Sequence, residues 1–148
     1  MSAVTIADTN ALYRLLVAST ADSSQYRKAF SAIGHLVVSP MVMTELDYLV
    51  TTKISAQAAY RALDFLARGA EGRKLSIPDV APHLRTAMTV LEGYRDADGG
   101  KGIGLADAMN VALAAAYRTD AMFTSDRHFR MIRPLTGHTA FRLLPEDL

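Results

Sequence analysis

The sequence predicts an α/β fold in which a central parallel sheet of about five strands is covered by helices on both faces. Short β-prone runs alternate along the chain with longer segments whose apolar residues recur at helical spacing. Because parallel neighbours need crossover connections, this alternation favours a three-layer α/β/α sandwich. With 148 residues, half of them apolar, the chain is expected to form a single domain over residues 1–148.

The strands are predicted from short runs rich in apolar and β-branched residues that end at polar or turn-forming residues. A strand buried on both faces is expected to be apolar throughout, as these runs largely are. In chain order they are residues 4–7, 36–38, 75–77, 121–124 and 141–144.

The helices are predicted from apolar stripes and from capping residues at their ends. Ser39 offers a capping hydroxyl just before Pro40, which suits the first position of a helix. Gly69 and Gly72 are expected to mark the turn out of a later helix. The predicted helices carry residues 12–16, 25–33, 40–52, 56–68, 78–94 and 105–117, and a short one runs from 126 to 131.

Two further expectations concern the surface and the core. The polar, glycine-rich stretch RDADGGKG, residues 95–102, reads as a mobile loop directly before the helix that carries Asp107. Apolar residues of the 78–94 helix and several methionines are expected to pack in the core. They are Val80, Leu84, Ala87, Met88 and Leu91, together with Met41, Met43, Met109 and Met122.

Composition excludes several kinds of site. There is no cysteine, which removes disulfides, thiolate zinc sites and cysteine nucleophiles. No apolar run reaches the roughly 20 residues of a membrane span, and no signal peptide is recognisable, so a cytoplasmic protein without membrane contact is expected. The net charge is only +1, but residues 118–142 hold five arginines against two aspartates, so a basic rim is possible.

Four acidic residues are expected to converge at one edge of the sheet. Asp8 and Asp126 follow predicted strands, and Glu45 and Asp107 lie in the early turns of helices. The carboxyl ends of parallel strands meet at one edge, where ligands usually bind. Clustered carboxylates repel one another, and all-oxygen ligands favour Mg²⁺ or Mn²⁺. Such a site suits phosphodiester hydrolysis with one metal or two.

Each residue also has a simpler interpretation. Asp8, Asp107 and Asp126 could be ordinary helix caps, and Glu45 could complement a helix dipole. Asp47 is expected on the opposite helix face from Glu45, in solvent. Arg127 and His128 flank Asp126 and could contact RNA phosphates, although exposure alone would explain them equally well.

Three blocks of the sequence resemble the PIN-domain ribonucleases, specifically VapC-type toxins of bacterial toxin-antitoxin pairs. The blocks are IADTNALYRLL, SPMVMTELDYLV and GLADAMNVALAAAYRTDAMFTSDRHF, in the family's order and covering essentially the whole chain. The resemblance implies a PIN-like fold and an acidic quartet, Asp8, Glu45, Asp107 and Asp126, that binds Mg²⁺ or Mn²⁺ and positions the attacking water. Thr9 or Asn10 and Thr124 match polar positions that orient the carboxylates.

The same resemblance implies partners. The expected substrate is a single-stranded or loop RNA, often tRNA or rRNA, cut to leave a 5′-phosphate and a 3′-hydroxyl. A homodimer and a cognate VapB-type antitoxin are also implied. The RDADGGKGIG stretch is longer than the simplest family version and leaves Asp96 and Asp98 as extra acids.

Two other functions compete with that of a nuclease. A PIN fold could act as a non-catalytic module that binds RNA or protein, although the intact quartet argues against it. A metal-dependent phosphatase would need a second carboxylate in a DxD-type motif after the first strand, and DTNAL lacks it.

Overall fold

A five-stranded parallel sheet forms the centre of the protein. The computed structural model describes residues 4–17 and 22–148. The strands run in the order β3-β2-β1-β4-β5, and every neighbouring pair is parallel. Their bounds are β1 Val4–Ala7, β2 His35–Val37, β3 Leu75–Ser76, β4 Ala121–Phe123 and β5 Arg142–Leu144. The predicted parallel sheet of about five strands is therefore confirmed.

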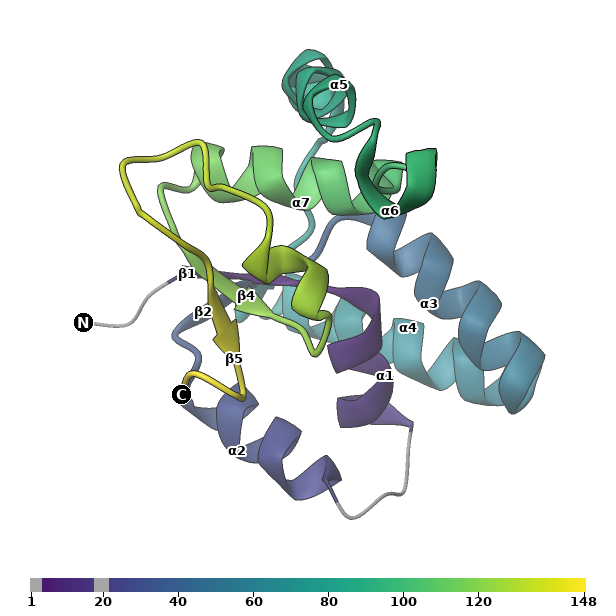
Figure 1. The fold of residues 1–148 in the computed structure, drawn as a ribbon. Coiled ribbons are helices and arrows are strands. Elements are labelled where there is room, and N and C mark those ends of the chain that lie inside the picture. The colour runs from purple at the N-terminus through teal and green to yellow at the C-terminus, as the bar shows by residue number, and fades with distance from the viewer. Residues whose placement is uncertain (1–3, 18–21) are drawn as a thin grey trace.

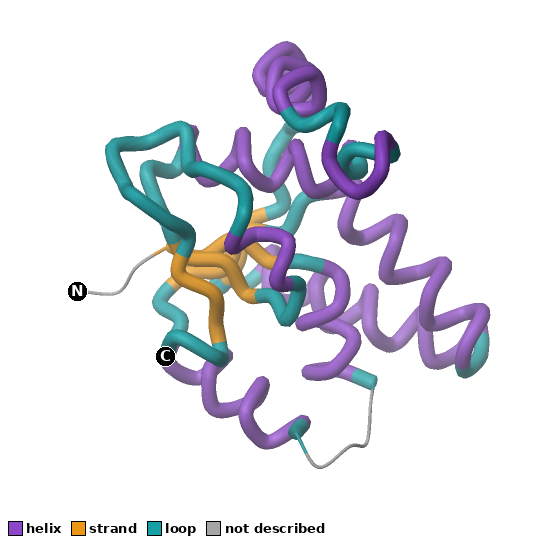
Figure 2. Tube along the Cα trace, in the orientation of Figure 1, coloured by secondary structure: helices purple, strands orange, loops and turns teal. Residues whose placement is uncertain are grey.

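Helices cover both faces of this sheet, as Figures 1 and 2 show. The helices α1 to α4 lie in the first half of the chain, and α5 and α7 pack together in the second half. The helices are α1 Thr9–Leu16, α2 Ser23–Ala32, α3 Pro40–Lys53, α4 Ala56–Glu71, α5 Leu84–Gly93, α6 Ala97–Gly100 and α7 Leu105–Ala116, with short 3-10 helices η1 Ala81–His83 and η2 Arg127–Arg130. The sheet therefore lies between two layers of helices, which gives the predicted three-layer α/β/α arrangement.

Alternate residues of the strands feed two separate cores. In β1, Ala7 packs with α1 to α4, whereas its neighbour Ile6 packs with α5 and α7. In β4, Phe123 packs in the same core as Ala7, and Met122 packs in the same core as Ile6. Successive side chains of a strand point to opposite faces, so the strands of a sheet covered on both faces are largely apolar, although Thr5 of β1 is also buried.

After β1, β2 and β4, a polar residue caps the helix that follows the strand. Asp8 follows β1 directly and caps α1, with its side chain accepting a hydrogen bond from the backbone N–H of Thr9. Ser39 caps α3 through the N–H of Met41, with Pro40 at the first helical position, as the sequence predicted. Asp126 caps η2 in the same way.

The start of α5 differs from the prediction. Residues 77–80 are not helical, and Pro82 lies in η1, so α5 begins only at Leu84. Pro82 is at the start of η1, where its missing N–H is tolerated, and the regular α-helix follows this short turn. The buried face of α5 is then carried by Ala87 and Val90. Leu84 is 40% exposed and Met88 is 47% exposed, so the prediction that both lie in the core is wrong.

Smaller differences concern the ends of elements. Gly69 does not mark the turn as expected but lies inside α4, which continues to Glu71, and its missing side chain leaves room for Leu75, because a Cβ at 69 would lie 2.7 Å from Leu75 Cδ2. The 95–102 stretch, expected to be a mobile loop, contains the short α6 and several residues at positive φ. Among the helices of residues 4–17 and 22–148, none is long and apolar enough to cross a membrane.

Candidate active site

Asp8 is the most deeply buried acid of the site. Only 4% of it is exposed. Its Oδ1 accepts a hydrogen bond of 2.8 Å from the N–H of Thr9. Its Oδ2 accepts one of 2.7 Å from Thr124 Oγ1 and a longer one of 3.4 Å from Asn10 Nδ2. Asp8 is therefore both the cap of α1 and a carboxylate held in a fixed orientation.

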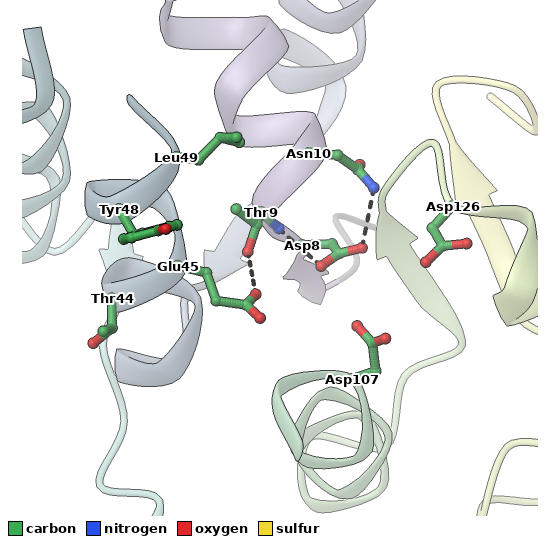
Figure 3. Close-up of a pocket in the computed structure, with 9 residues that line it drawn as sticks. All are labelled: Asp8, Thr9, Asn10, Thr44, Glu45, Tyr48, Leu49, Asp107 and Asp126. Carbon is green, nitrogen blue, oxygen red and sulfur yellow. Dashed lines mark hydrogen bonds between the residues drawn. The ribbon is translucent and has the colours of Figure 1, made fainter. Parts of the chain in front are cut away.

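Asp107 and Asp126 approach Asp8 from two other elements (Figure 3). Asp107 lies in the first turn of α7, and Asp126 follows β4 and begins η2. One carboxylate oxygen from each of the three acids lies within 4.8 Å of those of the other two. We call Asp8, Asp107 and Asp126 the acidic triad.

Glu45 lies on the wall opposite the triad. It is exposed on α3, and its Oε1 accepts a 2.7 Å hydrogen bond from Thr9 Oγ1. It shares with the triad an open pocket of about 620 Å³, drawn in Figure 3, but it is outside the group of acids that approach one another within 4.8 Å. Asp47 is exposed on the same helix, as predicted.

The triad carries an excess of negative charge. The pKa of Asp8 is raised by burial, against the hydrogen bonds from Thr124 and Thr9, and the charges of Asp126 and Glu45 raise it further. The pKa of Asp107 is raised to about 7, first by burial and then by the charges of Asp8, Asp126 and Glu45. A bound cation would remove this repulsion, and three carboxylates suit a hard divalent ion.

The polar residues that the sequence predicted beside the acids connect the segments after β1 and β4, which carry Asp8 and Asp126. Thr124 Oγ1 bonds to Asp8 and also accepts a 2.9 Å hydrogen bond from the N–H of Asp126. Asn10 Oδ1 accepts a 2.9 Å hydrogen bond from the N–H of Ser125. Thr9 holds Glu45. All three side chains therefore support carboxylates.

Two supporting residues were missed in the sequence. Asn110 is fully buried on α7, one turn after Asp107, and its Nδ2 donates a 3.2 Å hydrogen bond to the carbonyl of Ala7, just before Asp8. Thr119 Oγ1 donates to the carbonyl of Val4 at the other end of β1. For Asn110 the available signal was a polar residue within an apolar stretch, whereas Thr119 lies between Arg118 and Asp120 and offered no such signal.

The arginine excess near the C-terminus is partly neutralised. Arg130 donates two hydrogen bonds to Asp147, at 2.5 and 2.9 Å, and lies 3.4 Å from Glu146. Arg127 lies 3.6 Å from Glu146. The basic rim is therefore weaker than the count over residues 118–142 indicated, because the acids that pair with it lie beyond residue 142. His128 Nδ1 lies 3.1 Å from Asp126 Oδ1, at the triad itself.

Known proteins resemble the chain in sequence and in fold. The PIN domain family matches residues 5–133. Ribonuclease VapC26 of Mycobacterium tuberculosis is 39% identical over 134 residues, which cover 89% of this chain and 94% of that protein.

Solved structures share the fold at low sequence identity. VapC20 of Mycobacterium tuberculosis, described as a sarcin-ricin loop cleaving toxin, has a TM-score of 0.68 and 16% identity over 84% of this chain and 91% of that one. VapBC2 from Rickettsia felis, bound to a DNA fragment from its promoter, has a TM-score of 0.66 and 18% identity over 90% and 96%. A toxin-antitoxin complex from Klebsiella pneumoniae has a TM-score of 0.57 and 17% identity over 83% and 87%.

The matched region contains the whole acidic triad, since Asp8, Asp107 and Asp126 all lie within residues 5–133. The sequence match to a VapC ribonuclease extends over nearly all of the chain. The chain therefore belongs to the PIN-domain family, as a VapC-type ribonuclease toxin of a toxin-antitoxin system.

Proposed function

We propose that this protein is an endoribonuclease that uses Mg²⁺ or Mn²⁺ and cuts tRNA or rRNA to leave a 5′-phosphate and a 3′-hydroxyl. The observation that carries the proposal is the convergence of the acidic triad within 4.8 Å. The description of VapC20 as a toxin that cleaves the sarcin-ricin loop supports an rRNA target. The broad, open pocket in front of the triad suits a macromolecular substrate.

The donor set fits a divalent cation. The triad supplies only carboxylate oxygens, and the raised pKa values of Asp8 and Asp107 mark a site that lacks positive charge. When bound, a divalent ion supplies Lewis acidity for water activation and neutralises charge on the phosphoryl group.

The residues of the chain have distinct proposed roles. Asp8, Asp107 and Asp126 hold the ion, and Thr124 fixes the orientation of Asp8 through its 2.7 Å hydrogen bond. Glu45 acts from the opposite wall, as a ligand or through water, while Thr9 holds its carboxylate. Outer groups of this kind orient metal ligands and raise their affinity for the ion.

A cognate antitoxin is the proposed protein partner. Toxin-antitoxin assemblies are among the proteins of similar fold, which supports a partner of this class. A VapB-type antitoxin would inhibit by occupying the open pocket before the triad, and the toxin itself would act as a homodimer.

Cleavage by antitoxin-free protein tests the proposal. Total tRNA and rRNA are incubated with the protein in Mg²⁺, in Mn²⁺ and in EDTA, alongside Asp126→Ala and the control Asp47→Ala, which changes an exposed acid on α3. Discrete products that require metal, that Asp47→Ala retains and that Asp126→Ala loses, are expected. RNA binding without cleavage in every metal would favour the non-catalytic binding module instead.

A further inference from the structure

A second cavity of about 440 Å³ opens beside the triad. We call it the side cavity. It lies between the turn around α6, the first turn of α7 and the segment at η2, and Figure 1 shows α6 near the start of α7. Its lining includes the apolar side chains of Ile103, Met131 and Ile132, the ring of Tyr94, and the polar groups of Asp98 and His128. Its size is within the range of roughly 300–1,000 Å³ that small-molecule sites occupy.

The side cavity is continuous with the acidic centre. Asp107 lines both the side cavity and the open pocket in front of the triad. His128 also lines the side cavity, and its Nδ1 lies 3.1 Å from Asp126 Oδ1. A group seated in the side cavity is therefore a direct neighbour of a phosphate placed at the triad.

Backbone contacts hold the shape of the side cavity. The hydroxyl of Tyr94 accepts a 2.8 Å hydrogen bond from the N–H of Arg133, which fixes the tyrosine against the segment after η2. Gly102 has a φ of +69°, and a Cβ there would lie 3.3 Å from Arg95 Cα and 3.4 Å from Tyr94 O. Gly102 N–H also donates to the carbonyl of Ala97. Glycine suits position 102, and the two hydrogen bonds connect the turn around α6 and the segment after η2 to their neighbours.

The chemistry of the lining selects against a phosphate. Asp98 and Asp107 would repel an anion, whereas the apolar residues and Tyr94 suit a flat, uncharged ring. Proteins that recognise unpaired RNA stack bases on aromatic side chains and read base edges with polar groups. The Asp98 carboxylate can accept hydrogen bonds from base amino groups, and His128 can donate or accept.

We propose that the side cavity binds one unstacked nucleobase of the RNA, from a nucleotide next to the scissile phosphate. This inference rests on the proposed ribonuclease function and adds a determinant of its sequence preference. Tyr94 is the stacking residue, and Asp98 favours bases that carry an exocyclic amino group over uracil.

The test combines a protein change with the removal of a base. An RNA that the wild-type protein cuts at one position is made with single abasic nucleotides on either side of the cut. Tyr94→Leu is compared with Tyr117→Leu, because both tyrosines are half-buried and pack against the same core, but only Tyr94 lines the side cavity. Met131→Ala, at a residue that is 75% exposed, provides a second cavity variant without a risk to folding.

One abasic position is expected to lower kcat/KM about tenfold in wild-type protein and in Tyr117→Leu, as expected for the loss of a stacked base. Tyr94→Leu should lower kcat/KM on the intact RNA to a similar degree and show little further loss on the abasic RNA. Equal abasic losses in wild-type protein and Tyr94→Leu would overturn the proposal. So would a Tyr94→Leu variant that lost only antitoxin binding, since the cavity would then serve the protein partner.

A metal-free titration separates this proposal from the nuclease itself. The four nucleosides are added to ¹⁵N-labelled protein in EDTA, where no cleavage is possible. We expect changes in amide chemical shift that are confined to residues 94–104 and 128–132. These changes should be present in Tyr117→Leu and absent in Tyr94→Leu. This result would support the base site even if the wild-type protein cuts no RNA. Cleavage without these shifts and without the abasic coupling rejects the base site and leaves the nuclease standing.

Discussion

The hydroxyl of Thr124 donates a 2.7 Å hydrogen bond to Oδ2 of Asp8, and so joins two residues that are 116 positions apart in the sequence. The same oxygen accepts a 2.9 Å hydrogen bond from the N–H of Asp126. One buried side chain therefore fixes the ends of β1 and β4 relative to each other and sets the separation of two acids of the triad.

Thr124→Val keeps the shape of this residue and removes its hydroxyl. We expect divalent-ion affinity and cleavage to fall by about tenfold or more, because an outer group that orients a metal ligand is typically worth that much. Calorimetric titration with Mn²⁺ and single-turnover cleavage measure the two effects. Thr124→Ser should recover most of both, and Thr51→Val on the exposed face of α3 should change neither. Wild-type affinity in Thr124→Val would show that Asp8 is oriented by its other contacts.

The raised pKa of Asp107 predicts how the metal-free protein responds to pH. The pKa is about 7 in the folded protein, against an ordinary 3.8, so the folded state binds more protons than the unfolded state between these values. The free energy of unfolding should therefore fall as pH rises from about 4 to about 7. Asp107→Asn should make the free energy of unfolding less dependent on pH and raise it at pH 8 by about 1–2 kcal/mol. This is below the limit of about 4 kcal/mol that the whole change in the pKa of Asp107 implies.

Urea unfolding in EDTA at several pH values measures this dependence. Saturating Mn²⁺ should also flatten the fall for wild-type protein, because the ion replaces the proton on the site. An unchanged pH slope in Asp107→Asn would contradict the electrostatic account of the triad.

Glu45 should matter less than the acids of the triad, because it is exposed and lies outside their group. We expect Glu45→Gln to lower cleavage by about tenfold, as for an outer-sphere group, and Asp126→Asn to remove measurable cleavage. Thr9→Val should reproduce the Glu45→Gln effect, since Thr9 holds that carboxylate. If Glu45→Gln were as inactive as Asp126→Asn, Glu45 would have to move onto the ion with the substrate bound.

Asn110 should act on the site through the backbone. Its Nδ2 bonds to the carbonyl of Ala7, the residue before Asp8, while its Oδ1 has no hydrogen-bond partner in the structure. Asn110→Leu should lower the free energy of unfolding by only about 1 kcal/mol, because it also removes an unsatisfied acceptor. The same substitution should weaken Mn²⁺ binding. Thr89→Ala, on the exposed face of α5, is the control for both measurements. Unaltered Mn²⁺ affinity would restrict Asn110 to a packing role.

Local signals in the sequence were sufficient for much of this fold. Strands bounded by turn residues and the Ser39-Pro40 helix start depend on neighbouring residues alone, and the structure contains them nearly where they were expected. Asp8 and Asp126 follow strands, so the convergence of strand ends brought them together with Asp107.

Other features depend on contacts that a local pattern does not contain. The exposure of Met88 follows from which face of α5 packs against α7, since Ala87 and Val90 form the buried face. The pairing of Arg130 with Asp147 joins residues 17 positions apart, beyond the window over which charge was counted. The side cavity combines Tyr94, Ile103 and Ile132, which come from three segments that lie apart in the sequence and meet only in the folded chain.

Mn²⁺ binding to the purified, antitoxin-free protein shows whether the acidic triad forms one divalent-ion site. Calorimetric titrations at pH 8 compare wild-type protein with Asp8→Asn, Asp107→Asn and Asp126→Asn, and with Asp47→Asn as the exposed control. We expect each triad substitution to weaken Mn²⁺ binding strongly while Asp47→Asn binds as the wild type does. Undiminished Mn²⁺ binding in folded triad variants would contradict a metal site at the triad and show that the ion binds elsewhere.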